Sequence, residues 1–190
     1  MLIAFEGLDQ SGKQTQAEML RDWLRHDGRK ARLVSFPDYG TSIGEEIARA
    51  LQGEREYGAD VMQLLYVANR YERKPDLQRW LEGGIILVAD RYVASSIAYG
   101  EAHGVDPTWL SDIQRHLPAP ELTVLLDIAP SVSAQRKITD RDKYEQDLAL
   151  LGRVRESYLR QAGTGWLQLD ADRHRDLVAA DIWSAVQSRL

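Results

Sequence analysis

The sequence predicts an α/β fold of three layers, α/β/α, in which helices cover both faces of a five-stranded parallel sheet. Short apolar runs alternate with longer amphipathic runs along the whole chain, and two of the short runs are apolar almost throughout. Central strands of a parallel sheet are buried on both faces, so they lack the alternation of a half-exposed strand. The 190 residues contain no internal repeat, low-complexity segment or linker, so we expect a single domain.

The first part of the chain predicts two strands and three helices. Residues 2–5 form an apolar run before a glycine-bounded loop, as a buried strand does, and apolar residues recur at helical spacing through 13–27. A second apolar run at 31–36 predicts the next strand, and helices are expected at 43–52 and 59–82. Glycines stand where these helices should stop, at Gly28, Gly53, Gly83 and Gly84.

The remaining strands follow at wider intervals. Residues 85–90 and 122–128 are the two continuously apolar runs and predict central strands. A shorter run at 166–170 predicts the fifth strand. The helices expected between and after these strands cover 93–103, 108–117, 131–137, 143–161 and 175–189.

Composition excludes several classes of function. A net charge of −5 and an isoelectric point near 5.4 argue against a protein that coats nucleic acid, so any phosphate must bind at local basic positions. The chain has no cysteine, which excludes a disulfide framework, a thiolate zinc site and a cysteine nucleophile. Because no apolar run approaches the ~18 residues of a membrane span and no leader-like region precedes the first strand, we expect a cytoplasmic protein without nucleic-acid or membrane partners.

A phosphate-binding pattern, G-x-x-x-x-G-K, lies between the first strand and the first helix. Its fixed positions are Gly7, Gly12 and Lys13. Glycines let backbone N–H groups converge on an anion, and the lysine reaches the β- and γ-phosphates at a helix N-terminus. The strand and helix that flank it make an incidental glycine turn the weaker interpretation. The residues expected to contact ATP are Gly7, Gln10, Ser11, Gly12, Lys13, Gln14 and Thr15.

The position after Lys13 departs from this pattern. The pattern places Ser or Thr there as a Mg²⁺ ligand, whereas this chain has Gln14 followed by Thr15. The loop alone therefore does not establish a metal ligand.

Chemistry-bearing residues follow the first four predicted strands. Ligands of such sheets bind outside the carboxyl ends of the strands. Glu6 and Asp9 follow the first strand, residues 36–41 follow the second, and an Asp-Arg-Tyr run at 90–92 follows the third. Basic residues cluster at 136–143 beyond the fourth. Each could instead be a turn aromatic, a strand-end ion pair or a solvated face, but their location at one edge favours a common site.

The predicted helix at 59–82 carries Tyr66 and Arg70 four residues apart, on one face. A tyrosine ring can stack on a base, and an arginine one turn later can donate hydrogen bonds to a base carbonyl. The alternative is a partly buried tyrosine beside an exposed arginine.

Five segments that span nearly the whole chain resemble the thymidylate kinase family, in family order. They are residues 5–16, 36–40, 65–70, 90–99 and 140–145. A generic phosphate-loop protein would share only the first. The resemblance implies a P-loop NTPase fold in one domain over residues 1–190, with a lid at about 134–146. It also implies transfer of a phosphoryl group from ATP to dTMP with Mg²⁺, in dTTP synthesis, by a homodimer.

The resemblance also implies how dTMP is held. Tyr39 and Arg91 would bind its phosphate, Tyr66 would stack on thymine, and Asp9 would lie near the sugar 3′-hydroxyl. Tyr99 would lie under the sugar and exclude ribonucleotides. Tyr39 stands where many members have arginine, and Gly100 where glutamine is common. The full set expected to contact dTMP is Asp9, Phe36, Tyr39, Tyr66, Arg70, Arg91, Ser95, Ser96, Tyr99, Tyr144 and Glu145.

Catalytic roles follow from the same resemblance. Phosphoryl transfer requires alignment and positive charge near the moving group, and an ionised phosphate oxygen needs no general base. One branch of the family carries a basic residue in the phosphate loop where this chain has Gln10, so the resemblance places the catalytic arginine on the lid. The expected catalytic residues are Lys13, Arg91, Arg136 and Arg141, and the expected Mg²⁺ ligands are Asp9, Glu6 and Asp90.

Three functions compete at this stage. The first is a dTMP kinase. The second is a kinase of another nucleoside monophosphate or of a nucleoside, although a nucleoside would leave Tyr39 and Arg91 without a phosphate. The third is a nucleotide-binding regulatory protein without turnover, which only Gln14 favours.

Overall fold

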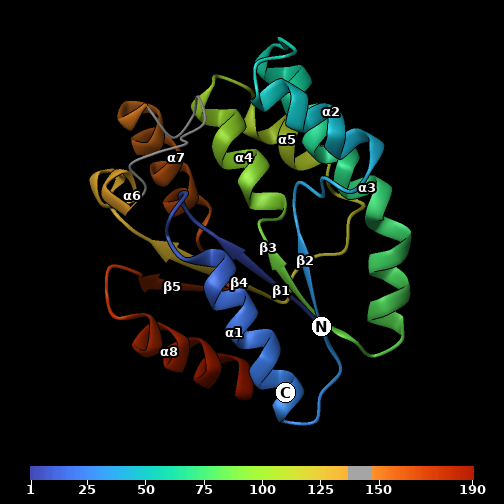
Figure 1. The fold of residues 1–190 in the computed structure, drawn as a ribbon, viewed down its shortest axis with the longest axis vertical. Coiled ribbons are helices and arrows are strands. Elements are labelled where there is room, and N and C mark those ends of the chain that lie inside the picture. Colours follow the sequence, from blue (N-terminus) through green and yellow to red (C-terminus); the bar gives the residue numbers. More distant parts are fainter. Residues whose placement is uncertain (137–146) are drawn as a thin grey trace.

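The structure, a computed structural model, describes residues 1–136 and 147–190. Five parallel strands form one sheet in the order β2-β3-β1-β4-β5, which confirms the predicted fold class (Figure 1). The strands are β1 Leu2–Glu6, β2 Ala31–Ser35, β3 Ile86–Asp90, β4 Leu122–Asp127 and β5 Trp166–Asp170. β1, β3 and β4 are almost completely buried, as their apolar sequences predict.

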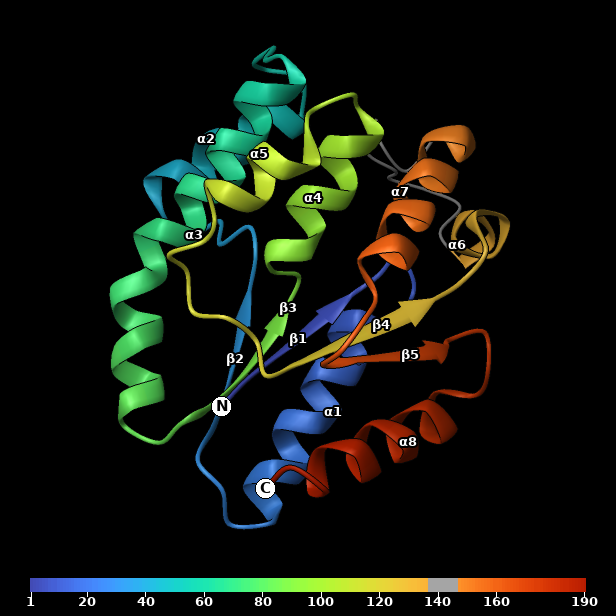
Figure 2. The same ribbon diagram turned by 180° about the vertical axis from the view of Figure 1, so that it is seen from behind.

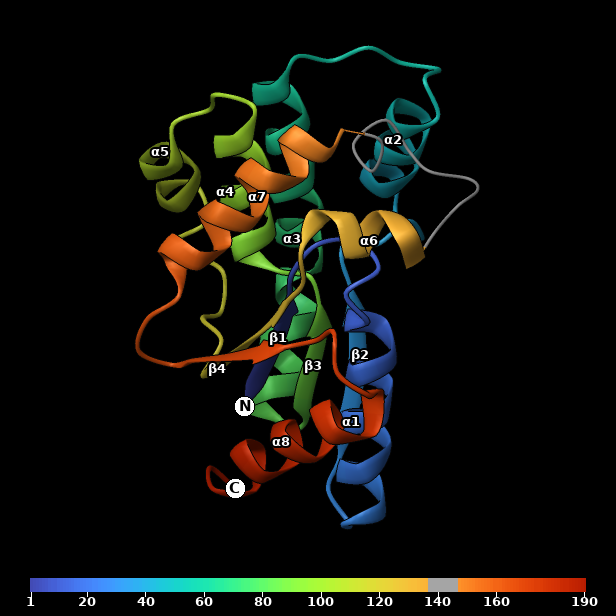
Figure 3. The ribbon, with the colours of Figure 1, turned by 90° about the vertical axis from the view of Figure 1, so that its left-hand side faces the viewer.

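Helices cover both faces of this sheet (Figures 1 and 2). On one face of the sheet, α1 Lys13–His26 packs against β3 and against α8 Arg175–Gln187. α3 Ala59–Glu82 also packs against β3. Figure 3 shows α1 on one side of the sheet and α4 and α5 on the other. The remaining helices are α2 Ser42–Leu51, α4 Val93–Ala102, α5 Pro107–Asp112, α6 Pro130–Arg136 and α7 Leu148–Gln161.

Two predicted helices differ from those observed. The helix expected at 108–117 ends at Asp112, because the chain continues in tight turns whose N–H groups bond three residues back and then meets Pro118. The helix expected at 143–161 is described from Leu148, where the Asp147 carboxylate accepts a 2.9 Å hydrogen bond from the Leu150 N–H. Of the expected lid, residues 137–146 lie outside the described part of the chain.

The described residues contain no helix that combines the length and the apolar character of a membrane crossing. The core instead lies between the sheet and its helices. Ile3 and Phe5 on β1 pack in a cluster with Leu20 and Leu24 of α1, while Leu2 and Ala4, on the opposite face of the strand, pack in a second cluster with residues of α3. This packing holds the carboxyl ends of β1 and β3 rigidly beside the start of α1.

Candidate active site

The phosphate loop needs glycine at its first position. Gly7 has φ 140°, and a Cβ there would lie 2.5 Å from the carbonyl oxygen of Leu126 on the neighbouring strand. The loop closes with a hydrogen bond from the Ser11 N–H to the Leu8 carbonyl, 3.2 Å, and Gly12 precedes α1 in the left-handed conformation. The backbone therefore has the tight turn that the sequence pattern predicts.

Lys13 is buried at the first position of α1, and its Nζ donates a 2.7 Å hydrogen bond to the Leu8 carbonyl. Burial, and then the nearby guanidinium of Arg91, lower the pKa of Lys13 to about 8. The side chain of Gln14 points away along the helix and donates a 2.9 Å hydrogen bond to the Glu18 carboxylate. In this arrangement the loop offers a cation for phosphates, and Gln14 does not contact the Lys13 ammonium group.

A cleft opens beside the phosphate loop and collects side chains from five separate segments of the chain. It is lined by Asp9, Phe36, Pro37, Tyr39, Leu51, Gln63, Tyr66, Arg70, Arg91, Ser95, Ser96, Tyr99 and His103. The structure thus brings together all nine described residues that the sequence assigned to dTMP. The other two, Tyr144 and Glu145, lie outside the described residues, as does Arg141 of the expected catalytic set.

Arg91 lines this cleft in a backbone conformation that is costly for an arginine. Its φ is 63°, in the left-handed region, immediately after β3. The guanidinium forms an ion pair with Asp9 and donates to the hydroxyls of Tyr99 and Ser95, both at 3.3 Å. Tyr99 in turn donates a 2.8 Å hydrogen bond to Asp9. These contacts fix the position of the guanidinium beside Asp9.

The charges in this cluster shift one another. Burial alone would raise the pKa of Asp9, but Arg91, Lys13 and the hydrogen bond from Tyr99 outweigh it and hold this pKa well below its usual range. Burial also raises the pKa of Tyr99 well above that of an exposed tyrosine. At neutral pH Asp9 is therefore ionised and Tyr99 is a neutral hydrogen-bond donor.

Glu6 is completely buried at the end of β1 and anchors the start of α4. Its carboxylate accepts hydrogen bonds from the N–H groups of Tyr92 and Ser95, at 2.9 and 3.3 Å. It also accepts from the hydroxyls of Ser95 and Tyr158, at 2.5 and 3.2 Å. Four donors therefore occupy this carboxylate, which fixes Ser95 behind Arg91.

Arg70 is 3% exposed on α3. Among the described residues, no carboxylate lies within 4.0 Å of its guanidinium to form an ion pair. Its Nη1 donates to Ser96 Oγ at 2.7 Å and to Gln114 Oε1 at 3.2 Å, while Nε has no hydrogen-bond partner. Burial lowers the pKa of Arg70 to about 10, so it remains charged at neutral pH. A buried cation with only neutral partners can bind a further acceptor in the cleft.

Two further expected residues lie near the phosphate loop. Arg136 donates to the carbonyls of Gln10 and Ala171, at 3.1 and 3.0 Å, and pairs with Asp172 at 3.0 Å. It thereby connects the loop to the segment after β5. Asp90, at the end of β3, has a buried carboxylate oxygen without a hydrogen-bond partner.

Several residues of this region were not identified from the sequence. Gln63 lies one turn before Tyr66 on the cleft face of α3, with a buried carbonyl oxygen that lacks a partner, and helical spacing could have identified it. Gln114, Tyr158 and Asn69 act through contacts between distant segments, for which the sequence holds no local signal. The structure also explains the glycine at position 100, because a Cβ there would lie 2.4 Å from the Leu110 side chain.

A sequence model of the family described as thymidylate kinase matches residues 5–182. The chain belongs to the thymidylate kinase family. Thymidylate kinase of Schizosaccharomyces pombe is 33% identical over 193 residues, which cover 98% of this chain and 91% of that protein. The human thymidylate kinase is 31% identical over 186 residues, 95% of this chain and 87% of that protein. A solved structure of thymidylate kinase from Candida albicans matches with a TM-score of 0.86 and 28% identity, covering 99% of this chain and 91% of that one.

Membership decides among the three functions that the sequence left open. The chain is a dTMP kinase and acts in dTTP synthesis. Members of the family use ATP as phosphoryl donor. The resemblance inferred from five sequence segments is therefore confirmed.

Proposed function

We propose that dTMP occupies the cleft between α3 and α4 with its base against Arg70. The observation that carries this assignment is a buried guanidinium that has no carboxylate partner among the described residues. A thymine carbonyl supplies the acceptor that Arg70 Nε lacks, and the ring of Tyr66 lies one turn away on the same helix face. A guanidinium bound to the O4 carbonyl of thymine would reject cytosine, which carries an amino group at that position and keeps only the O2 carbonyl.

The other end of the cleft would hold the acceptor phosphate. Arg91 supplies a fixed guanidinium and Tyr39 a phenol at the mouth of the cleft, where it is 50% exposed. Asp9, ionised between Arg91 and Tyr99, would accept a hydrogen bond from the sugar 3′-hydroxyl. The phosphate oxygen that attacks ATP is already ionised, so these residues align it and no side chain has to remove a proton.

The donor ATP would lie on the phosphate loop with Lys13 at its β- and γ-phosphates. Lys13 and Arg91, together with Arg136 and Arg141 of the lid region, would provide positive charge at the transferred group. Of the expected metal ligands, Asp90 fits Mg²⁺ best because one of its buried oxygens has no partner, and Asp9 is the second candidate.

Glu6 is less suited to the metal than the sequence suggested, because its carboxylate already accepts four hydrogen bonds; we assign it the role of holding Ser95 and Tyr158. The residues that the structure describes contain no cluster of three or more metal-ligating side chains. Mg²⁺ in phosphotransferases is typically held by one or two carboxylates together with the phosphates of the substrate, and it neutralises the charge of those phosphates.

A substitution at Tyr99 tests this arrangement. If Tyr99 excludes the ribose 2′-hydroxyl, the Tyr99→Ala variant should phosphorylate UMP about tenfold better relative to dUMP than the wild type does, since one removed steric contact is typically worth ~1–3 kcal/mol. ADP formation with dTMP, dUMP, UMP and thymidine measures this ratio. An unchanged ratio of UMP to dUMP would contradict the placement of the sugar over Tyr99.

ATP binding should take up a proton at alkaline pH. Lys13 in the free protein has a pKa of about 8, below the usual lysine value, so it is largely neutral at about pH 9. Bound phosphates favour the charged form and raise this pKa, so binding at about pH 9 protonates Lys13, while binding at about pH 7 adds almost no proton there. Titration calorimetry in two buffers of different ionisation enthalpy counts the protons.

The Lys13→Arg variant is the matched control for this experiment. A guanidinium stays protonated over the whole range, so its proton uptake at about pH 9 should be absent. Equal uptake by the variant and the wild type would show that another group titrates.

We also propose that the chain forms a homodimer through α3 and acts in the cytoplasm. Val61 and Leu64 lie on the outward side of α3 with exposed fractions of 39% and 45%, and Tyr57 precedes the helix with 36%. Exposed apolar side chains gathered on one helix support an interface between copies of the chain.

A further inference from the structure

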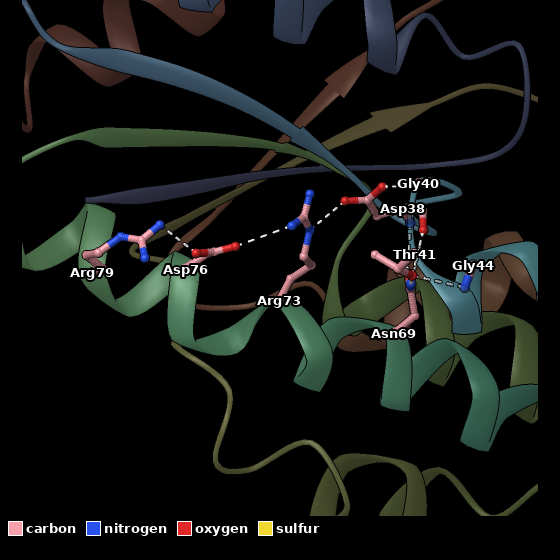
Figure 4. Close-up of polar contacts among 8 residues, drawn as sticks. All are labelled: Asp38, Gly40, Thr41, Gly44, Asn69, Arg73, Asp76 and Arg79. Carbon is pink, nitrogen blue, oxygen red and sulfur yellow. Dashed lines mark hydrogen bonds and ion pairs between the residues drawn. The ribbon is translucent and has the colours of Figure 1, made fainter.

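The segment at 37–41, between β2 and α2, holds Tyr39, which lines the cleft beside Pro37. Tyr39 is 50% exposed at the mouth of the cleft. The backbone of the residues on either side sets the place from which its phenol reaches into the cleft. Figure 4 shows that side chains of α3 bind Asp38 and Thr41, and that the Asp38 carboxylate in turn binds the Gly40 N–H.

Asn69 of α3 is the centre of these contacts. Its side chain is completely buried, and both the oxygen and the nitrogen of its amide form hydrogen bonds with the segment at 37–41. The Asn69 Oδ1 accepts a 2.7 Å hydrogen bond from the Asp38 N–H, and Nδ2 donates to the Asp38 carbonyl at 3.1 Å and to Thr41 Oγ1 at 2.9 Å. These three bonds fix the backbone immediately before and shortly after Tyr39. A carboxylate of the same shape could not donate the last two.

Helix α2 closes the segment from its other side. The Thr41 hydroxyl donates to the Asp38 carbonyl at 3.1 Å and accepts a 3.0 Å hydrogen bond from the Gly44 N–H, as the N-cap of α2. A Cβ at Gly44 would lie 1.9 Å from the Asp38 carbonyl oxygen. The segment is therefore packed directly between the backbone of α2 and the side chains of α3.

A second contact reaches the segment from the next turn of α3. The Asp38 carboxylate accepts from the Gly40 N–H at 2.9 Å and from Arg73 Nε at 2.6 Å. Arg73 also pairs with Asp76 at 3.2 Å, and Asp76 pairs with Arg79 at 2.6 Å (Figure 4). Arg79 ends this row of charges, with 70% of its side chain exposed, and it pairs with Asp76 rather than with the segment at 37–41.

The same helix carries Arg70, the residue proposed to bind the base, directly after Asn69. One rigid element thus holds both ends of the acceptor: Arg70 points into the cleft, and Asn69 and Arg73 hold the segment that presents Tyr39. The cleft can therefore keep a fixed separation between the base contact and the phosphate contact.

We infer that Asn69 is a positioning residue for the acceptor phosphate, acting through the backbone around Tyr39, with Arg73 as a second and weaker contributor. This inference rests on the proposed placement of dTMP. The phosphate contact would then depend on Asn69 even though Asn69 does not touch the substrate.

The test compares the affinity for dTMP with the affinity for thymidine. The ratio of the dTMP affinity to the thymidine affinity reports recognition of the phosphate alone. We expect Asn69→Ala to weaken dTMP binding about tenfold, from the loss of ordered hydrogen bonds worth ~1.4 kcal/mol, while thymidine affinity changes less than about twofold. The KM for dTMP should rise as dTMP binding weakens, and the KM for ATP should not rise. Arg73→Gln should shift the ratio in the same direction by about threefold. Arg79→Gln, which changes the same kind of ion pair farther from the segment, should leave the ratio unchanged.

Different outcomes separate this inference from the proposed acceptor site. If Tyr39→Phe lowers the ratio but Asn69→Ala and Arg73→Gln do not, the phosphate site stands and the positioning role is wrong. An equal loss of dTMP and thymidine affinity in Asn69→Ala also contradicts that role, because it shows damage to the base site. If Arg91→Ala and Tyr39→Phe both leave the ratio unchanged, the placement of the phosphate is itself wrong. Should Asn69→Ala fail to fold, Arg73→Gln, at a partly exposed position, decides the result.

Discussion

Arg91→Ala is expected to lower kcat/KM for dTMP by 10²-fold or more, as the loss of a charged group that positions the reacting phosphate typically does. The guanidinium is held by Asp9, Tyr99 and Ser95, so its geometry exists before substrate binds. Removing it also takes away the guanidinium that pairs with the Asp9 carboxylate beside the acceptor phosphate. Initial rates across dTMP concentrations, at saturating ATP, measure the change.

Arg91→Lys separates charge from geometry in this experiment. Lysine keeps the positive charge but has a single ammonium group in place of the planar fork, so an intermediate loss is expected. Binding of ATP alone should change much less than kcat/KM for dTMP in both variants. A loss below about threefold in Arg91→Ala would exclude Arg91 as a phosphate ligand.

Arg70→Met is expected to lower kcat/KM for dTMP by about 10²-fold while leaving the fold nearly as stable, because hydrogen bonds to a charged group are worth ~1.5–3 kcal/mol. Met fills a similar volume. It removes hydrogen bonds to Ser96 and Gln114 but also removes a buried charge without a carboxylate partner among the described residues, so these effects oppose each other. Kinetics with dTMP and dCMP, together with thermal unfolding, give the two results.

A purely structural role of Arg70 predicts the opposite pattern. In that case the free energy of unfolding would fall by several kcal/mol, as it does when a buried network is broken, and the preference for dTMP over dCMP would persist in the remaining activity. Titration with ATP provides the control, because the phosphate loop is not built from α3 and its affinity should be retained.

The sequence was sufficient for the sheet and for most of the cleft. The continuously apolar runs marked β3 and β4 as inner strands, which lie on either side of β1, and the phosphate loop follows β1 as the glycine spacing requires. Residues that follow different strands meet at one edge because parallel strands end together, and this rule sufficed to gather Asp9, Tyr39 and Arg91. These predictions depend on local patterns combined with one general property of parallel sheets.

Features that depend on contacts between distant segments could not be predicted. Tyr158 on α7 reaches Glu6 and Ser95 across more than sixty residues of sequence, and Gln114 reaches Arg70 from beyond α5. The early end of α5 depends on how the chain turns toward Pro118. Neither side-chain type nor spacing marks such residues, since buried tyrosines and glutamines occur in most cores.

The left-handed backbone at Arg91 sets an unfavourable main-chain conformation against favourable side-chain contacts at a single residue. Glycine adopts that conformation without the ~1–2 kcal/mol that a residue with a Cβ loses there. A glycine there would relieve the backbone but would leave Asp9 without the guanidinium that it pairs with, and breaking a buried ion pair typically costs ~3–5 kcal/mol. Heat-resistant variants of this enzyme are therefore best sought at positions other than Arg91.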